Sequence, residues 1–347
     1  MGGTGGPGSM NRPDAFTRSS ECAQSMREWF RTLLVSLVLM VTPALVVLLA
    51  GAARGPILVS PNHRFLQFQD GAPFFWLGDT AWLLLSELDR AETERYLEDR
   101  RRKGFNVIQV MALHSAAARS AYGIPALVEG NLDKPNTTPG NDPSRPGEYD
   151  YWDHLDWVLD TAASKEIFVA LVPAWGSLAR KGELNAGNVI SYATFLARRY
   201  RDKPNVFWMV GGDVRGDQQT EVWKLMGRTL KKEDPGHLIT FHPFGRTQSS
   251  TWFHEQPWLD FNMFQSGHRR YDQDDTPRHY GEDNWRYVSD DYARQPAKPT
   301  LDGEPSYENI PQGLHDTTQP YWTDNDCRRY AYCCLLYTSP SPRDRTR

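Results

Sequence analysis

The sequence predicts an α/β protein with the architecture of a (β/α)8 TIM barrel. From Phe74 onwards, short apolar runs alternate with longer amphipathic stretches, a pattern typical of repeated strand–helix units. No Gly-rich phosphate motif follows the first apolar run, which disfavours a dinucleotide-binding sheet. Two of the runs end in a glycine turn followed by a carboxylate, and barrel proteins carry their functional groups at strand ends of this kind.

The elements are expected in a regular order along the chain. Apolar runs predict strands at residues 74–79, 106–111, 168–172, 206–210, 238–242, 259–265 and 299–302. Helical periodicity covers residues 91–103, 152–165, 188–201, 221–233 and 285–294, and predicts a last helix over 321–336. Phe65–Phe68 and the Asp70-Gly71 turn predict a small hairpin that closes the barrel floor. Residues 116–147 are too long for a plain connector and predict a lid or a substrate-binding wall.

Both ends of the chain are expected to lie outside the barrel domain, which we place at residues 56–333. Residues 33–53 form an apolar run behind Arg27 and Arg31, so residues 26–53 predict a secretory signal peptide or, if uncleaved, a membrane anchor. Residues 1–25 are rich in Gly and Ser and predict a disordered leader or a mis-assigned start. We therefore expect an exported protein, either periplasmic, extracellular or membrane-anchored.

The C-terminal segment has an unusual sequence. Residues 334–347 can be back-translated into a string that resembles a transposon-library sequencing adapter, which would make them non-native. The alternative is an ordinary disordered tail rich in Pro, Ser and Arg. With only seven predicted strands before this segment, we expect an incomplete barrel that lacks its eighth strand.

Composition narrows the classes of partner. Lys and Arg number 39 against 43 Asp and Glu, a net charge of −4, so no basic face for nucleic acid is expected. The 12 Trp and 15 Tyr residues either line a groove that stacks on flat ligands such as sugar rings or fill an aromatic core. The four cysteines show no zinc spacing, and neither an HExxH pair nor a GxSxG elbow is present. We expect no cofactor and no metal ion.

Asp213 and Glu304 are the two carboxylates at predicted strand ends. Asp213 closes the run Val206–Asp213 and Glu304 lies in the run Lys298–Pro305. Glycoside hydrolysis needs two such groups, because one protonates the departing oxygen while the other attacks or stabilises the cationic sugar. In the alternative interpretation Asp213 caps the following helix and Glu304 is a structural acid.

Other polar and aromatic residues are predicted at the same end of the barrel, as substrate-binding groups. Amides, imidazoles and an aromatic platform suit sugar hydroxyls, because each hydroxyl both donates and accepts. The predicted set is Asp79, Gln109, His114, Trp175, His242, Gln265, His268, Tyr307 and Glu308.

Five motifs together resemble the apiosidase-like glycoside hydrolases, which are secreted bacterial barrels related to cellulase-type enzymes. The motifs are Phe75–Trp82, Lys103–Gln109, Trp208–Asp213, Gln265–His268 and Lys298–Glu308, within a match from Pro61 to Tyr332. The resemblance implies that Asp213 is the acid/base, that Glu304 is the nucleophile-like carboxylate and that the anomeric configuration is retained. It also implies the apiose branch of rhamnogalacturonan-II, a pectic polysaccharide, as substrate. Family members often continue into a C-terminal β-sandwich that is missing here, so we expect the chain alone to be inactive.

We therefore expect a glycoside hydrolase that cleaves apiosyl or related linkages of plant cell-wall pectin, with an oligo- or polysaccharide as substrate. Two alternatives stay open, namely a non-catalytic cell-surface carbohydrate-binding barrel and a cellulase-like β-glycanase of other specificity. A binding barrel has no reason to hold the two carboxyl groups within about 5–10 Å of each other. For general acid catalysis near neutral pH, Asp213 needs a raised pKa, which burial or a neighbouring carboxylate can supply.

Overall fold

The computed structural model describes residues 55–145 and 147–337, and the compact unit within it begins at Pro56. The expected leader, the signal or anchor segment and residues 338–347 lie outside the described residues. Residues 334–337 belong to the last helix, α10 (Asp324–Tyr337). No helix in the described part of the chain is long and apolar enough to cross a bilayer.

Parallel strands form the centre of the unit in the predicted order. β4 (Gly78–Thr80), β5 (Val107–Met111), β6 (Phe168–Val172), β7 (Val206–Val214) and β8 (Ile239–Pro243) pair as parallel neighbours in that sequence. β10 (Asn262–Gln265) and β11 (Thr300–Asp302) form a parallel pair, and β9 (Thr247–Gln248) joins β10 antiparallel. This arrangement confirms the predicted parallel α/β class.

The two parallel groups meet between β8 and β10. The N–H of Asp260 donates to the carbonyl of Ile239 at 2.9 Å, and the Thr240 hydroxyl donates to the carbonyl of Phe261 at 2.8 Å. From Ile239 to Thr240 and from Asp260 to Phe261 the two segments each advance by one residue in the same direction, as the partners of parallel strands do. Across residues 55–145 and 147–337, seven strands therefore run in one direction and their carboxyl ends face the same side.

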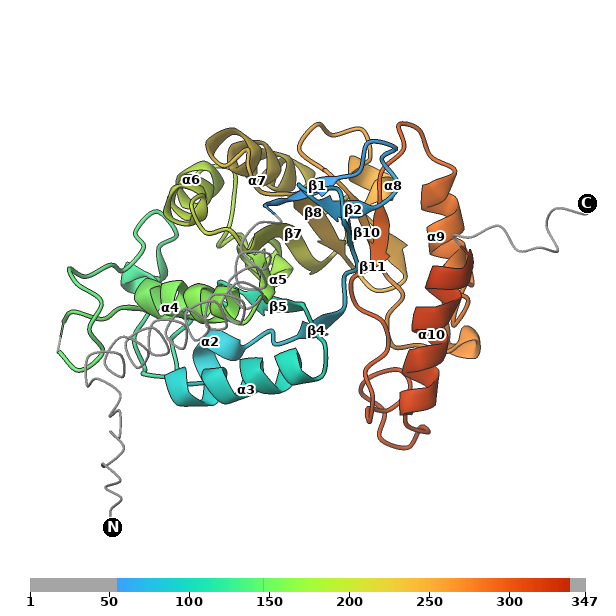
Figure 1. Ribbon diagram of the computed structural model, residues 1–347, viewed down its shortest axis with the longest axis horizontal. Coiled ribbons are helices and arrows are strands. Elements are labelled where there is room, and N and C mark those ends of the chain that lie inside the picture. The colour runs from blue at the N-terminus through green and yellow to red at the C-terminus, as the bar shows by residue number, and fades with distance from the viewer. Residues whose placement is uncertain (1–54, 146, 338–347) are drawn as a thin grey trace, which may run out of the picture. The chain divides into compact units, whose positions relative to one another are not determined.

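Long helices follow most of these strands close to the predicted positions (Figure 1). Asp89 and Asp150 each form a capping box at the start of their helices, and Gly104 ends the first of these with a φ of +86°. The long helices are α3 (Arg90–Arg102), α4 (Tyr151–Ser164), α6 (Val189–Tyr200), α7 (Thr220–Glu233), α9 (Trp285–Tyr292) and α10. Short helices were not predicted, because four or five residues show no periodicity; they are α2 (Leu84–Glu87), α5 (Gly176–Arg180) and α8 (Ser250–Phe253).

An antiparallel hairpin closes the floor of the barrel, as predicted. β1 (Ile57–Val59), β2 (Leu66–Phe68) and β3 (Pro73–Phe74) form a small sheet of their own. The Phe74 ring lies 5.2 Å from Phe168, the first residue of β6, and 5.9 Å from Phe207, the second residue of β7. The prediction of a strand over residues 74–79 was therefore wrong at its start: Phe74 belongs to the hairpin, and the first barrel strand begins at Gly78.

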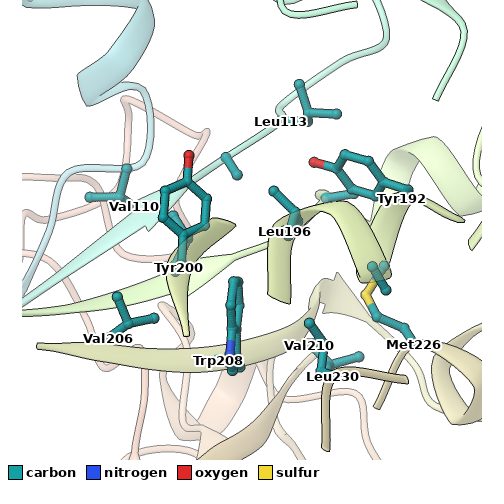
Figure 2. Close-up of a cluster of buried hydrophobic side chains, with 14 of the residues drawn as sticks. Val110, Leu113, Tyr192, Leu196, Tyr200, Val206, Trp208, Val210, Met226 and Leu230 are labelled. Carbon is teal, nitrogen blue, oxygen red and sulfur yellow. The ribbon is translucent and has the colours of Figure 1, made fainter. Parts of the chain in front are cut away.

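Alternation along the strands divides the apolar core into two layers. Outward-facing residues of β5 and β7, such as Val110 and Trp208, belong to one cluster with Leu196 of α6 and Leu230 of α7, part of which Figure 2 shows. The inward-facing residues form a second cluster with the hairpin. Because side chains alternate with a period of two, β5, β6 and β7 each supply both layers.

The long segment 116–147 packs against α4. Ala118, Ala126 and Leu132 are buried, and the indole of Trp152 donates to the carbonyl of Ala126 at 2.9 Å. The segment contributes no residue to the cavity that holds the candidate catalytic groups. The apolar side chains of this segment therefore pack on α4, and the predicted lid or substrate-binding wall stays a prediction.

Candidate active site

A cavity of about 300 Å³ lies at the carboxyl ends of the strands and contains both predicted carboxylates. Asp213 enters it from β7 and Glu304 from the residues that follow β11. Parallel strands that end on one side bring these residues together although they are far apart in the sequence. The cavity is lined by Trp82, Trp175, Asp213, Phe244, Gly245, Arg246, Gln265, Gly267, His268, Arg269, Glu304, Tyr307, Gly313, Leu314 and His315.

Glu304 is buried and surrounded by hydrogen-bond donors. Nε2 of Gln265 donates to its Oε2 at 2.8 Å, and the Tyr307 hydroxyl donates to its Oε1. Nε2 of His242 lies 3.3 Å from Oε2, and Nε2 of His268 lies 3.5 Å from Oε1. Burial by itself raises the pKa of Glu304, but these donors outweigh it and hold the pKa well below its usual range. Glu304 is therefore an ionised carboxylate at neutral pH.

Asp213 occupies a distorted end of β7. Pairing with β8 is interrupted between Gly211 and Val214, and Asp213 has a left-handed backbone with a φ of +50°. Burial, followed by the negative charge of Glu304, raises the pKa of the Asp213 carboxyl. The two carboxyl groups in the cavity therefore differ in the direction of their pKa shifts, and Asp213 is the one that holds its proton more strongly.

The Gly211-Gly212 pair makes this geometry possible. Gly212 has a φ of +102°, and a Cβ there would meet the Trp175 ring at 2.5 Å. A Cβ on Gly211 would meet the carbonyl oxygen of His242 at 2.7 Å. Only glycine tolerates both the dihedral angles and the close approach. The indole of Trp175 consequently lies against the backbone that presents Asp213.

Two further residues support the pair from below and beside it. The indole N–H of Trp82 donates to the Tyr307 hydroxyl at 2.8 Å, so Trp82 orients the donor to Glu304. Nε2 of Gln109 donates to the carbonyl of Gly303 at 2.6 Å, which ties β5 to the residue before Glu304. Gln109 is buried beneath the cavity and does not line it, so its place is that of a support.

Besides Nη1 of Arg246, two buried polar atoms on the cavity wall have no hydrogen-bond partner within the described residues. They are Nδ1 of His268 and Oε1 of Gln265. Each side chain uses its other polar atom on Glu304. Unpaired buried polar atoms are costly, so their presence on a cavity wall indicates groups that a ligand satisfies.

The structure brings together some of the predicted residues and separates others. Trp175, Gln265, His268 and Tyr307 line the cavity with the two carboxylates, and His242 lies directly behind Glu304. Asp79, His114 and Glu308 do not line it.

The three separated residues have structural reasons for their positions. Asp79 points outward from β4, where its Oδ2 accepts from Nη1 of Arg100 at 2.8 Å and from the Tyr96 hydroxyl at 2.9 Å. His114 is half-buried beside Ser86, with Nδ1 3.4 Å from its hydroxyl, and burial lowers its pKa. Glu308 is exposed to solvent. In each case the chain position was near a strand end, but the side-chain direction was not predictable from it.

Sequence reasoning missed several cavity residues. Trp82 falls within a quoted motif, and its place two residues after β4 was an available signal. Phe244, Arg246 and Arg269 belong to loops after β8 and β10, where spacing alone does not indicate which side chains turn inward. No group of three or more potential metal ligands is assembled within residues 55–145 and 147–337.

Comparison with known proteins agrees with this geometry. The sequence model of the apiosidase-like catalytic domain matches residues 60–339. The chain belongs to the apiosidase-like family. The match covers the whole described barrel apart from its first residues, and therefore both Asp213 and Glu304.

Solved structures place the apiosidase-like chain among glycoside hydrolase folds. A glycoside hydrolase family 5 protein from Bacteroides vulgatus is 44% identical, with a TM-score of 0.77, over 82% of this chain and 61% of its own. A second structure, described as a glycoside hydrolase, is 45% identical, with a TM-score of 0.75, over 83% of this chain and 64% of its own. The chain thus spans less than two thirds of the length of each of these two proteins.

More distant structures show the fold alone. A family 5 mannosidase from Rhizomucor miehei is 15% identical, with a TM-score of 0.55, over 82% of this chain and 81% of its own. A comparison with curated proteins gave no match.

Proposed function

We propose that this apiosidase-like domain is a retaining glycoside hydrolase, with Asp213 as the acid/base and Glu304 as the nucleophile. One observation carries the proposal: a single cavity holds two carboxyl groups whose pKa values are shifted in opposite directions. A pair of this kind separates the protonated acid from the ionised nucleophile, which is the division of roles that glycoside hydrolysis requires.

The chemistry follows from these protonation states. Glu304 attacks the anomeric carbon while Asp213 gives its proton to the departing glycosidic oxygen, so the C–O bond breaks and a glycosyl ester forms. Asp213, now ionised, takes a proton from water, and the water oxygen displaces Glu304 from the anomeric carbon. The sugar leaves with its original configuration, and Asp213 is again protonated.

Neighbouring groups suit the binding of a sugar ring. The unpaired Nδ1 of His268 and Oε1 of Gln265 offer a nitrogen and an acceptor to hydroxyl groups near Glu304. Trp175 and Phe244 offer aromatic faces, and Phe244 is 40% exposed at the cavity rim. A carbohydrate satisfies both kinds of group, because a pyranose or furanose ring combines apolar faces with hydroxyl edges.

The proposed substrate is an apiosyl or related linkage of plant cell-wall pectin, of the rhamnogalacturonan-II type. Family membership supports this choice. The residues of the cavity suit a sugar but do not distinguish apiose from other sugars. We also propose that the protein is exported, on the basis of the apolar run at residues 33–53 behind two arginines.

The test is turnover in the full-length protein, with carboxamide variants that keep side-chain shape. Asp213→Asn and Glu304→Gln should each lower kcat on pectin-derived oligosaccharides by about 10²-fold or more, with binding nearly intact. A 2-fluoro glycoside should trap a covalent adduct whose mass maps to Glu304. Unchanged turnover in both variants would overturn the roles of Asp213 and Glu304, whereas oligosaccharide binding without turnover in the wild type would favour a carbohydrate-binding barrel.

A further inference from the structure

Two arginines line the cavity beside the candidate catalytic pair. Arg246 follows β8 and Arg269 follows β10, and both belong to the cavity wall. The Arg246 side chain is buried to all but 8%, with a left-handed φ of +64° that turns it inward. Burial and the nearby charge of Arg269 lower the pKa of Arg246. Two like charges held together in this way need a negative partner.

Asp275 is the residue that currently supplies most of that negative charge. Its Oδ1 lies 3.1 Å from Nη1 of Arg246 and 3.1 Å from Nη1 of Arg269. The Asp275 side chain is nevertheless 73% exposed, so water competes for it and the pairs contribute little stability. Although Asp275 lies this close, Nη1 of Arg246 makes no aligned hydrogen bond with any described residue.

The other nearby carboxylate is already committed. Oδ1 of Asp274 accepts from the backbone N–H and the hydroxyl of Thr276, and its Oδ2 accepts from the N–H of Gly281 at 2.9 Å. It approaches Nε of Arg246 only to 4.0 Å. Asp274 therefore fixes its own loop and leaves Nη1 of Arg246 to Asp275.

Two glycines lie beside the arginines in the cavity wall. Gly245 precedes Arg246 and Gly267 lies opposite, where an added Cβ would come 3.6 Å from the Cα of Gly245. Neither glycine has a side chain that would narrow the cavity that Arg246 and Arg269 line with Glu304. On the rim, Phe244 exposes an apolar face on which a ring can stack.

We propose that Arg246 and Arg269 form an anion site for a sugar carboxylate in the unit next to the cleaved bond, with Asp275 as an exchangeable internal counter-ion. The assignment of that unit to a position beside the cleaved bond rests on the proposed function, but the anion site itself does not. An incoming carboxylate takes both guanidinium groups in place of Asp275, which returns to solvent. Guanidinium groups recognise carboxylates through paired, charge-assisted hydrogen bonds, so neutral sugars lose this interaction.

A matched pair of ligands tests the site without any turnover. D-galacturonate and D-galactose differ only in having a carboxylate or a hydroxymethyl group at one carbon. By calorimetry or NMR titration of the full-length protein, galacturonate should bind about tenfold more tightly at low salt. The preference should shrink at about 0.5 M salt, since the interaction is between charges near solvent.

Three variants then locate the effect. Arg269→Gln should remove most of the preference for the acid, and Arg270→Gln is the matched control, because Arg270 pairs with Asp272 and does not line the cavity. Asp275→Asn should strengthen galacturonate binding several-fold, since the competing carboxylate is gone while the side-chain size is kept. A structural role for Asp275 alone would instead weaken binding in that variant.

The outcomes separate this proposal from the proposed function. Three results would overturn the anion site, even if the protein hydrolyses glycosides. They are equal affinity for the two sugars, binding of neither sugar at about 50 mM, and a preference for galacturonate that survives Arg269→Gln. The reverse outcome is also possible. If the wild type turns over no glycoside, while the preference for galacturonate persists in Glu304→Gln, the proposed function is overturned and the anion site still stands.

Discussion

Nε2 of His242 lies 3.3 Å from Oε2 of Glu304, behind the carboxylate that closes the cavity. Nδ1 of the same ring accepts the backbone N–H of Asp213 at 3.3 Å. Because Nδ1 is an acceptor, the ring proton is on Nε2 and faces Glu304. One buried imidazole therefore accepts from the backbone of the residue with the raised pKa and places its Nε2 beside the residue with the lowered pKa.

This bridge predicts that His242 controls the ionisation of Glu304. His242→Ala should lower kcat by about 10²-fold and move the acid limb of the pH–rate profile to higher pH, because Glu304 loses a donor that lowers its pKa. His242→Gln, which keeps a donor and an acceptor, should recover part of both. The control is His254→Ala, since His254 is equally buried but pairs with Asn262 and Pro296. It should lower stability and leave the pH profile unchanged.

The raised pKa of Asp213 predicts the alkaline side of the profile. Asp213 acts as an acid only while protonated, so activity should fall as the pH rises through its pKa, at a higher pH than for an ordinary aspartate. The charge of Glu304 contributes to that shift after burial. In Glu304→Gln the pKa of Asp213 should therefore fall part of the way toward its usual value. A carboxyl 13C titration measures it, and an unchanged pKa would contradict the electrostatic coupling.

The same shift has a consequence for stability. A carboxyl whose pKa is higher in the folded than in the unfolded protein binds its proton more tightly when folded, so its contribution is present at low pH and lost as the pH rises through the folded pKa. Relative to the wild type, Asp213→Asn should therefore become more stable between acidic and neutral pH. Urea unfolding of both proteins at several pH values measures this, and a pH-independent difference counts against the shift.

The close contact at Gly212 predicts that its replacement damages the site. Gly212→Ala should reduce turnover by an order of magnitude or more and destabilise the fold by about 1–3 kcal/mol, because the new Cβ would meet the Trp175 ring and the positive φ is strained. Gly236→Ala is the control, since a Cβ there has only one neighbour within 4 Å, at 3.9 Å. Kinetics with thermal unfolding separates the two effects. Full activity in Gly212→Ala would show that Trp175 moves freely.

Asp79 tests a residue that should not affect catalysis. The sequence predicted it as a substrate-binding residue, but its side chain does not line the cavity. Asp79→Asn should leave kcat and KM unchanged, while it weakens the contacts to Arg100 and Tyr96. Both partners are partly exposed, so the cost should be about 1 kcal/mol. Urea unfolding measures the cost. A large loss of kcat with normal stability would return Asp79 to the active site.

The sequence by itself determined the order of the elements and the carboxylates that share one side of the barrel. Apolar residues repeat with a different period in strands than in helices. Runs such as Phe168–Val172 and Val189–Tyr200 were therefore predictable from local residues. The glycines before Asp213 and Glu304 marked the strand ends, and the carboxyl ends of parallel strands face the same side. These inferences need only neighbouring residues and the direction of a strand.

The tertiary structure alone decided which side chains turn into the cavity and what charge they carry there. Asp79 and Glu304 both lie at or near strand ends, yet Asp79 faces Arg100 and Glu304 faces His242 and Gln265. Side-chain direction depends on strand alternation and on bulges such as the one at Gly211–Val214, and a shift of one residue reverses it. The opposite pKa shifts of Asp213 and Glu304 arise from burial and from donors on other strands. Such long-range neighbours are created only when the chain folds.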